Sequence, residues 1–407
     1  MNIVFLALIL VSFAVAAFAE LTGRGGAMEA LSAAMIESAA GAVPLALGLV
    51  GVMALFLGVM KVAEEGGLLS AIARLLEPAL RRLFPDIPAG HPAMGAMVMN
   101  IAANLLGLGN AATPFGIRAM EHLEELNRRK GIASNAQVLF LAINTAGITL
   151  LPTNVIALRA SLGSADPAAV VAPTLIATIA ATLVAVVAAK AMQRLWSPEP
   201  PTVVERGEPG ALWPCLTVLG VLLALLPVLV IHGKAFGPWI LPAVVAGLLL
   251  FGAIRRVRLY EAFVEGARDG FTVAIRIIPY LVAILAAIGM LRASGAMALL
   301  LEPLGRLTAP LGVPAEALMM AGMRTLSGSG SYGLLAASLK DPAIGLDGYL
   351  GILLGTIYGS TETTFYVLAV YFGAVQVRRI RHALAVGLLA DLAALVAAVI
   401  ACRLMFG

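Results

Sequence analysis

The sequence has little charge, few aromatic residues and almost no cysteine. Of its 407 residues, 12% are charged and 6% are aromatic, while 61% are hydrophobic. Soluble domains carry about 25% charged residues, so an ordinary soluble domain is excluded. The two cysteines, Cys215 and Cys402, both lie in apolar segments without metal-ligand spacing. The sequence therefore predicts neither a disulfide framework nor a zinc site.

Patterns that carry catalysis are also missing. No Ser–His–Asp arrangement, phosphate-binding loop or His/Glu metal spacing is visible. An enzyme acting on lipid-linked substrates would need a water-accessible carboxylate pair, and the sequence shows no obvious one. We therefore expect no enzymatic activity, no cofactor and no metal. The net charge of +4 comes from short basic clusters between apolar runs, which is typical of cytoplasmic loops and predicts no nucleic-acid partner.

Long apolar runs dominate what is present. The mean hydropathy is +0.98, and runs of about 20 residues, enough to cross a bilayer, recur along the chain. The sequence therefore predicts an all-α polytopic membrane protein. Residues 1–19 end in Ala-Phe-Ala, which resembles a signal-peptidase site, but they lack a basic start and their apolar run is long. We expect a retained first helix, with a cleaved signal as the alternative.

Four apolar segments contain residues that break helices. Residues 100–116, NIAANLLGLGNAATPFG, and residues 326–334, LSGSGSYGL, combine glycines with polar side chains. The apolar runs 136–158 and 349–372 are interrupted by NTAGITLLPTN and GTIYGSTETT. Backbone that leaves a helix within hydrocarbon must be buried in protein or line a watery cavity, because lipid offers no hydrogen-bond partner. These segments therefore predict a polar site at membrane depth.

The two halves of the chain repeat the same order of segments. LLEP at 75–78 matches LLEP at 300–303, GLGN at 107–110 matches GSGS at 328–331, and residues 144–153 match 355–364. The Pro- and Glu-rich stretch SPEPPTVVERGEPG lies between them. The sequence thus predicts one repeat at 1–197, a linker at 198–210 and a second repeat at 211–407. The second is expected to begin with two helices, 211–231 and 238–254, joined by a tight HGKAFG turn.

Basic residues indicate how the repeats are oriented. In the first half they flank the broken segment densely, at Lys61, Arg74, Arg81, Arg82, Arg118, Arg128, Arg129 and Lys130. The equivalent region of the second half has only Arg292, Arg306, Arg324 and Lys340. Because cationic loops stay in the cytoplasm, we expect the first broken segment to enter from inside and the second from outside. The predicted fold is two inverted-topology repeats with re-entrant or discontinuous helices.

Inverted repeats bring helix ends and free carbonyls together near the bilayer midplane, where a solute or ion can bind. We expect the substrate-binding side chains to be the neutral donors and acceptors at the breaks, namely Asn104, Asn110, Thr113, Asn144, Thr145, Thr149, Thr153, Ser327, Ser329, Ser331, Thr356, Ser360, Thr361, Thr363 and Thr364. For any one Ser or Thr, interhelical packing is the simpler interpretation. Their clustering at paired breaks favours a site.

Glu362 is the sharpest single candidate. A carboxylate within STETTFYV at membrane depth costs several kcal/mol unless it is paired, protonated or bound to a cation. We expect it to couple transport to H⁺ or Na⁺. The alternative is a structural ion pair with Arg276 or Arg324. Asp391, in the last helix, has the same two interpretations, with the structural one ahead.

Long motifs resemble a known pair of families. The first half, through MKVAEEGGLL, LFPDIPAGHPAMG, MNIAANLLGLGNAATPFGIRAME and NTAGITLLPTNVIALR, resembles spore maturation protein A. The second half, through FVEGARDGFTVAIRIIPYLVAILAAIGM, SGSGSYGLL, GSTETTFYVLAVYFG and RRIRHALAVGLLADLAALVAA, resembles spore maturation protein B. The whole chain is similar to a fusion of the two, within the nucleoside-recognition (Gate) superfamily.

The resemblance implies membrane transport or gating and, in spore formers, a role in dehydrating the spore core. Two departures limit it. The abundance of Ala, Gly and Arg indicates a GC-rich genome rather than a typical spore former, and Glu362 stands where the spore maturation B pattern tends to have Asp. No GTPase motif of the ferrous iron transporter kind accompanies the chain, which argues against active iron uptake.

We therefore expect a transporter or gated permeation protein in the bacterial inner membrane, crossing it several times. Its partners would be membrane lipids, a small polar solute, of which a nucleoside-like one is a candidate, and a coupling H⁺ or Na⁺; a homo-oligomer is left open. The alternative is a non-transporting scaffold or assembly factor in envelope or spore maturation, in which the helix breaks serve packing only.

Overall fold

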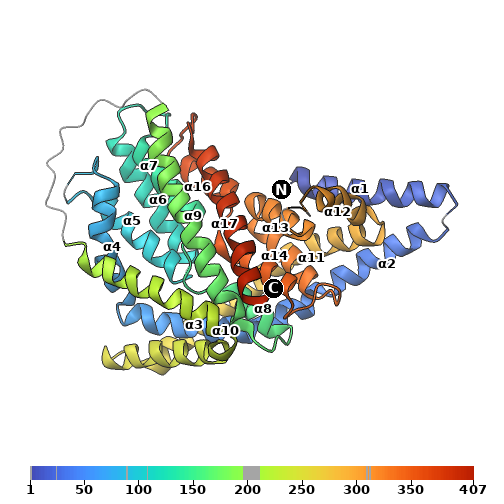
Figure 1. The fold of residues 1–407 in the computed structure, drawn as a ribbon, viewed down its shortest axis with the longest axis horizontal. Coiled ribbons are helices and arrows are strands. Elements are labelled where there is room, and N and C mark those ends of the chain that lie inside the picture. Colours follow the sequence, from blue (N-terminus) through green and yellow to red (C-terminus); the bar gives the residue numbers. More distant parts are fainter. Residues whose placement is uncertain are drawn as a thin grey trace.

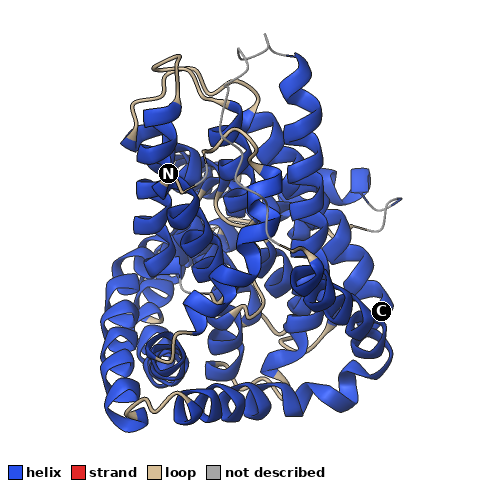
Figure 2. Cartoon of the chain, turned by 90° about the vertical axis from the view of Figure 1, so that its left-hand side faces the viewer, coloured by secondary structure: helices blue, strands red, loops and turns tan. Residues whose placement is uncertain are grey.

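The chain folds into helices joined by short loops (Figures 1 and 2). The computed structural model describes residues 2–23, 25–88, 90–107, 109–195, 211–308, 310 and 313–407. Within these ranges there is no β-strand, only an isolated bridge between Ile132 and Arg379. The predicted linker 198–210 lies outside the described residues.

The helices of the first half lead to a long apolar helix near its end. Its helices are α1 (Asn2–Leu21), α2 (Ala27–Ala40), α3 (Ala42–Glu65), α4 (Leu68–Leu83), α5 (Pro92–Leu105), α6 (Gly109–Leu126), α7 (Asn135–Ala146), α8 (Thr153–Ser161), the short η1 (Pro167–Val170), α9 (Val171–Met192) and η2 (Gln193–Leu195).

The second half shows the same succession after two long helices. Its helices are α10 (Trp213–Ile254), α11 (Leu259–Ala293), α12 (Ala296–Thr308), α13 (Ala315–Leu326), α14 (Gly328–Leu339), α15 (Tyr349–Ser360), α16 (Thr364–Ala374) and α17 (Ala383–Phe406).

Several helical segments are suited to a membrane. In the described part of the chain, three are long and apolar enough to cross one, namely Ala27–Glu65, Pro167–Leu195 and Ala383–Phe406. A fourth is added if the bent pair Leu281–Ala293 and Ala296–Thr308 is one span. Together with the all-helical content, they confirm the fold class of an all-α membrane protein. The inverted relation of the two halves stays a prediction.

One predicted feature of the second half is wrong. Helix α10 runs without interruption from Trp213 to Ile254, so the expected turn at HGKAFG is absent. Each glycine in a helix costs about 1 kcal/mol relative to alanine. In an apolar setting that cost is smaller than the cost of leaving backbone groups without hydrogen bonds.

The four predicted helix breaks are all present, and each has a local cause. Gly107, between α5 and α6, has φ +73°, and Gly147, which caps α7, has φ +57°; side chains rarely adopt this left-handed region. Ser327, between α13 and α14, is extended and its hydroxyl accepts the Gly330 amide at 3.0 Å. Residues 361–363 separate α15 from α16. Pro114 lies inside α6 and does not interrupt it.

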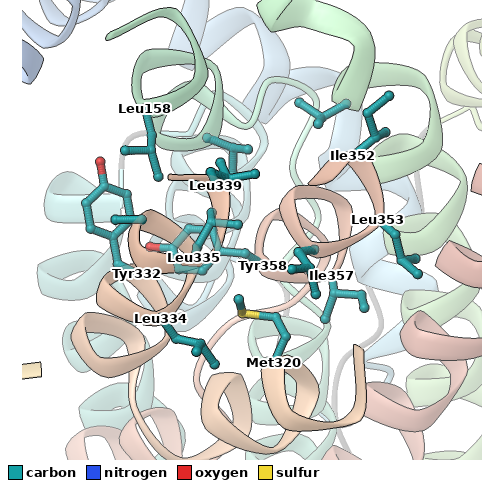
Figure 3. Close-up of a cluster of buried hydrophobic side chains, with 14 of the residues drawn as sticks. Leu158, Met320, Tyr332, Leu334, Leu335, Leu339, Ile352, Leu353, Ile357 and Tyr358 are labelled. Carbon is teal, nitrogen blue, oxygen red and sulfur yellow. The ribbon is translucent and has the colours of Figure 1, made fainter. Parts of the chain in front are cut away.

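Two large clusters form most of the apolar interior of the described residues, and each contains parts of both halves. A small third cluster holds Ala16, Leu31 and Met290. The α14 core is formed by buried side chains of α3, α8, α11, α13, α14, α15 and the end of α17. Figure 3 shows its centre, with Leu158 of α8 beside Tyr332 and Leu335 of α14 and Tyr358 of α15. The α5 core is formed by α4, α5, α6, α7, α16 and the start of α17.

The two interrupted helices, α7–α8 and α15–α16, run antiparallel to one another. At one end the Ala133 amide donates to the Arg379 carbonyl at 3.0 Å. In the middle the Glu362 amide donates to the Thr145 carbonyl at 2.9 Å. At the other end Arg159 Nη1 donates to the Leu346 carbonyl at 2.7 Å. Antiparallel pairing of corresponding elements is what an inverted repeat requires.

Candidate functional site

The two interrupted helices touch at their breaks. A Cβ added to Gly147 would lie 2.8 Å from the Glu362 amide nitrogen and 3.0 Å from the Thr361 carbonyl carbon, so only glycine permits this approach. The break between α5 and α6 also contacts the break between α7 and α8, because the Leu150 amide donates to the Leu105 carbonyl at 3.0 Å. Unpaired backbone groups of three breaks thus satisfy one another.

The fourth break, at Ser327, is joined through Arg324 in the last turn of α13. Arg324 is 7% exposed. Its Nε donates to the Thr361 carbonyl at 2.8 Å, and Nη2 donates to the same carbonyl. Its guanidinium also lies 4.5 Å from the centre of the Tyr358 ring, a favourable cation–π distance. Arg324 therefore connects the α14 core to the break between α15 and α16.

Amide side chains surround the breaks of the first half. Asn104 Nδ2 donates to Asn144 Oδ1 at 3.0 Å, and the Tyr371 hydroxyl donates to the same oxygen at 3.4 Å. Asn100 Nδ2 donates to the Tyr371 hydroxyl at 3.1 Å and to the Ala112 carbonyl at 2.8 Å. The amides of α5 and α7 are thereby joined to α16 of the other half. Asn100 Oδ1 is buried without a partner.

Glu362 forms an ion pair with Arg324, one of the two partners considered from the sequence. Its Oε2 lies 3.4 Å from Arg324 Nη2, and its side chain is 42% exposed whereas that of Arg324 is 9% exposed. The side chain of Arg276, the other suggested partner, lies outside the described residues. The carboxylate of the pair is thus partly exposed, while the guanidinium is buried.

The remaining predicted site residues divide into two groups. Those at the breaks are the buried Thr145, Thr361 and Thr363, the half-buried Thr149 and Thr153, the buried Ser327 and the exposed Ser329. Thr149 donates to the Gly147 carbonyl at 2.9 Å, and the buried Thr145 hydroxyl has no partner. Arg324 Nη1 lies 3.5 Å from Thr363 Oγ1.

The side chains of the second group bind the backbone of their own helix. Ser331, Thr356 and Ser360 are buried, and each donates to a carbonyl three or four residues earlier. These hydrogen bonds agree with the interpretation that the three hydroxyls serve helix packing. Thr113 is half-buried in α6. The side chain of Asn110 lies outside the described residues.

Three residues of the polar network around the breaks are not among the predicted site residues, namely Asn100, Tyr371 and Thr178. Thr178 of α9 donates to the Gly147 carbonyl at 3.0 Å. A tyrosine or threonine in an apolar run gives no local signal, since its partner lies far away in the chain. Asn100 could have been chosen, because it precedes Asn104 by one helical turn.

A second missed cluster lies at one end of the interrupted helices. Arg159 is fully buried, and its Nη2 donates to Asp347 Oδ1 at 2.8 Å and to Ser164 Oγ at 3.1 Å. Asp347 lies in the loop before α15. Burial raises the pKa of Asp347, but hydrogen bonds from Ser164 and Ala165 and the charge of Arg159 outweigh this effect, so that the pKa lies below its usual value. This ion pair joins the last turn of α8 to the loop before α15.

Two of the four helix breaks, between α7 and α8 and between α15 and α16, lie where the chain passes from one apolar core to the other. Buried residues of α7 belong to the α5 core and those of α8 to the α14 core. Helix α9 changes cores between Ala177 and Ala181, at Thr178. We call the polar groups at this boundary the polar layer, consisting of Asn104, Asn144, Thr145, Thr178, Arg324, Thr361, Glu362, Thr363, Thr364 and Asp391.

The fold and the site define the class of this protein, which is an all-α membrane protein with a polar layer between two apolar cores. The chain belongs to the Gate family, described as "Nucleoside recognition", whose model matches residues 46–194 and 274–378. These two ranges contain all four helix breaks.

Two curated proteins of Bacillus subtilis (strain 168) resemble parts of the chain. Spore maturation protein A is 45% identical over 153 residues, which are 38% of this chain and 78% of that protein. Spore maturation protein B is 43% identical over 167 residues, which are 41% of this chain and 93% of that protein. The resemblance to both spore maturation proteins is thereby confirmed. No solved structure matches the chain.

Proposed function

We propose that this protein is a transporter or gated permeation protein for a small polar solute in the bacterial inner membrane, which it crosses several times. The observation that carries the proposal is the meeting of four helix breaks in one polar layer between two apolar cores. Non-helical backbone at membrane depth is tolerated where it is buried in protein or lines a watery cavity. Discontinuous helices at a repeat interface are the usual architecture of a transport site.

The chemistry of the polar layer favours an uncharged solute with several hydrogen-bonding groups. The amide of Asn144 carries donors and an acceptor, which bind Phe140, Asn104 and Tyr371 in this arrangement, and the buried Thr145 hydroxyl lacks a partner. Such groups recognise hydroxyls and ring nitrogens without the cost of a buried charge. The family description supports a nucleoside-like solute as the first class to test.

Glu362 is the proposed coupling group. Its carboxylate is half exposed and held by Arg324 at 3.4 Å, so an arriving H⁺ or Na⁺ competes with the guanidinium for it. Neutralising or binding Glu362 would loosen the contact of Arg324 with the break between α15 and α16. The proposal needs no chemical step, no cofactor and no metal other than a coupling Na⁺. A homo-oligomer is compatible with it.

A specific observation favours a second candidate, a non-transporting membrane scaffold in envelope or spore maturation. Most polar groups at the breaks bind one another, as Asn104 binds Asn144 and Arg324 binds Thr361. Groups that are already satisfied can serve packing alone. The relatives are named for spore maturation, a process that a scaffold can also serve.

Flux measurements on the full chain in liposomes separate the two candidates. Radiolabelled uridine and adenosine serve as probes, with an imposed H⁺ or Na⁺ gradient. We expect wild-type uptake, a loss of at least about tenfold in Glu362→Gln, and about tenfold weaker apparent affinity in Asn144→Ala, which corresponds to about 1.4 kcal/mol. Glu302→Gln is the matched control, because Glu302 pairs with Arg306 on an exposed face of α12.

The opposite pattern supports the scaffold. If wild-type liposomes transport neither probe above empty ones, while both site variants still complement a deletion of the gene in cells, the permeation proposal fails. Equal uptake by the wild type and both site variants would show that the polar layer is not part of the transport path.

A further inference from the structure

Asp391 is a carboxyl in the middle of an apolar helix. Helix α17 (Ala383–Phe406) is one of the candidate spans, and its only other charged residue is Arg403 in the last turn. Buried residues of α17 belong to the α5 core up to Ala394 and to the α14 core from Leu395 onward. Asp391 lies one helical turn before this change and so within the polar layer.

The contacts of Asp391 are hydroxyls rather than cations. Its Oδ2 lies 2.6 Å from Thr364 Oγ1 and 3.0 Å from Thr325 Oγ1. Its Oδ1 is buried and has no hydrogen-bond partner. Among the residues that the structure describes, no Lys, Arg or His nitrogen forms an ion pair with it. A carboxylate in such surroundings costs several kcal/mol at membrane depth, and protonation removes most of that cost.

Among the described side chains, no titratable group on the helices packed against α17 neutralises it. The titratable groups of these helices are Lys190 of α9, Cys215, His232 and Lys234 of α10, Glu316 and Arg324 of α13, Tyr349 and Tyr358 of α15, Tyr366 and Tyr371 of α16, with none on α7. The side chains of Cys215, His232 and Lys234 lie outside the described residues. Lys190 donates to the Leu83 carbonyl at 2.7 Å. Arg324 is bound to Thr361 and Glu362.

The hydroxyl of Thr325 fits a protonated partner. It lies 3.0 Å from the Ala321 carbonyl, one turn earlier in α13, and 3.0 Å from Asp391 Oδ2. A hydroxyl has one proton, and the carbonyl can only accept. When Thr325 donates to Ala321, its contact with Asp391 is a hydrogen bond only if the carboxyl donates. Protonated Asp391 then donates from Oδ2 to Thr325 and accepts from Thr364.

We propose that Asp391 is a proton-binding site of this protein, occupied in the arrangement described here and separate from Glu362. With the proton bound, the polar layer holds one positive charge, on Arg324, and one negative charge, on Glu362. Release of the proton leaves a net negative charge between two apolar cores, which requires water or a cation to enter. Proton release at Asp391 is therefore linked to opening of the polar layer. This linkage, but not proton binding itself, rests on the proposed permeation function.

Infrared difference spectroscopy of the full chain in liposomes tests proton binding directly. As the pH is raised from about 5 to about 9, we expect the C=O stretching band of a protonated carboxyl to disappear. The band should be missing at every pH in Asp391→Asn and present in Glu362→Gln. In Thr364→Val it should change frequency, because the 2.6 Å partner of the carboxyl is lost.

The test remains decisive if one variant does not fold. A wild-type protein without any pH-dependent carboxyl band overturns the proposal, as does a band that persists unchanged in Asp391→Asn. Parallel uridine flux separates the two proposals. If flux is absent while the Asp391 band responds as expected, the permeation function fails and the proton site stands. If flux is present without the band, the proton site fails.

Discussion

The two interrupted helices have the same architecture but different chemistry at their breaks. In α7–α8 the break is formed by a left-handed glycine, Gly147, and is surrounded by the neutral amides Asn104 and Asn144. In α15–α16 the break is held by the buried guanidinium of Arg324 and carries the Glu362 carboxylate. The difference indicates a division of roles, in which the first break offers hydrogen bonds to a solute and the second responds to ions.

The two ends of this antiparallel pair also differ. Near α7, most of the connection is loop backbone on loop backbone, as Arg379 donates to the Gly131 carbonyl at 3.0 Å and accepts from Ala133. One side chain adds to it, because Arg381 Nη1 donates to the Ala133 carbonyl at 3.0 Å. Near α8, the connection is the ion pair of the buried Arg159 with Asp347, whose side chain is 42% exposed. Backbone hydrogen bonds do not depend on side chains or pH, whereas an ion pair depends on both. The end near α8 is therefore the one that a substitution or acid can weaken selectively.

The largest effect is expected where the two breaks touch. Gly147→Ala places a Cβ 2.8 Å from the Glu362 nitrogen and forces alanine to φ +57°. Backbone strain and the clash together should lower the free energy of unfolding by about 4 kcal/mol. Thermal denaturation in detergent measures the loss.

Gly163→Ala is the matched control for Gly147→Ala. Gly163 has φ +84° but no neighbour within 4 Å of an added Cβ, so it carries the strain without the clash. We expect a loss of about 1 kcal/mol there. Equal losses in both variants would mean that the approach of the two breaks does not contribute to stability.

An intermediate effect is expected at the end near α8. Arg159→Met keeps the apolar stem but removes one partner of Asp347 and the side-chain partner of the Leu346 carbonyl. Breaking a fully buried pair costs about 3 kcal/mol. Because Asp347 is 42% exposed, we expect a loss of about 2 kcal/mol here. Arg306→Met is the control, because its pair with Glu302 is exposed and should be worth less than about 1 kcal/mol. Similar melting temperatures for the two variants would show that the end near α8 is no more vulnerable than the surface.

The helix breaks could be predicted from the sequence because their causes are local. Glycines such as Gly107 and polar side chains inside apolar runs locate all four, and a carboxylate at membrane depth singles out Glu362 with Arg324 as one suggested partner. The meeting of the breaks could not be derived in detail, because it depends on distant contacts. Asn100 and Tyr371 are 271 positions apart, and Arg159 looks like an ordinary basic residue at the end of an apolar run.

The smallest effect is expected from pH at the Asp347 end. The pKa of Asp347 lies below its usual value, because hydrogen bonds and Arg159 outweigh the effect of burial. A carboxyl whose pKa is lowered by folding stabilises the protein above its unfolded pKa of about 3.9, and the contribution disappears as the pH falls through the folded value. The wild type should therefore be more stable than Asp347→Asn at neutral pH, and the difference should shrink below about pH 4. Ser164→Ala, which removes the 2.5 Å hydrogen bond to Asp347, should lie between them. Denaturation midpoints of the three proteins over this pH range measure the effect, and parallel curves would show that the ion pair does not set the acid sensitivity of this end.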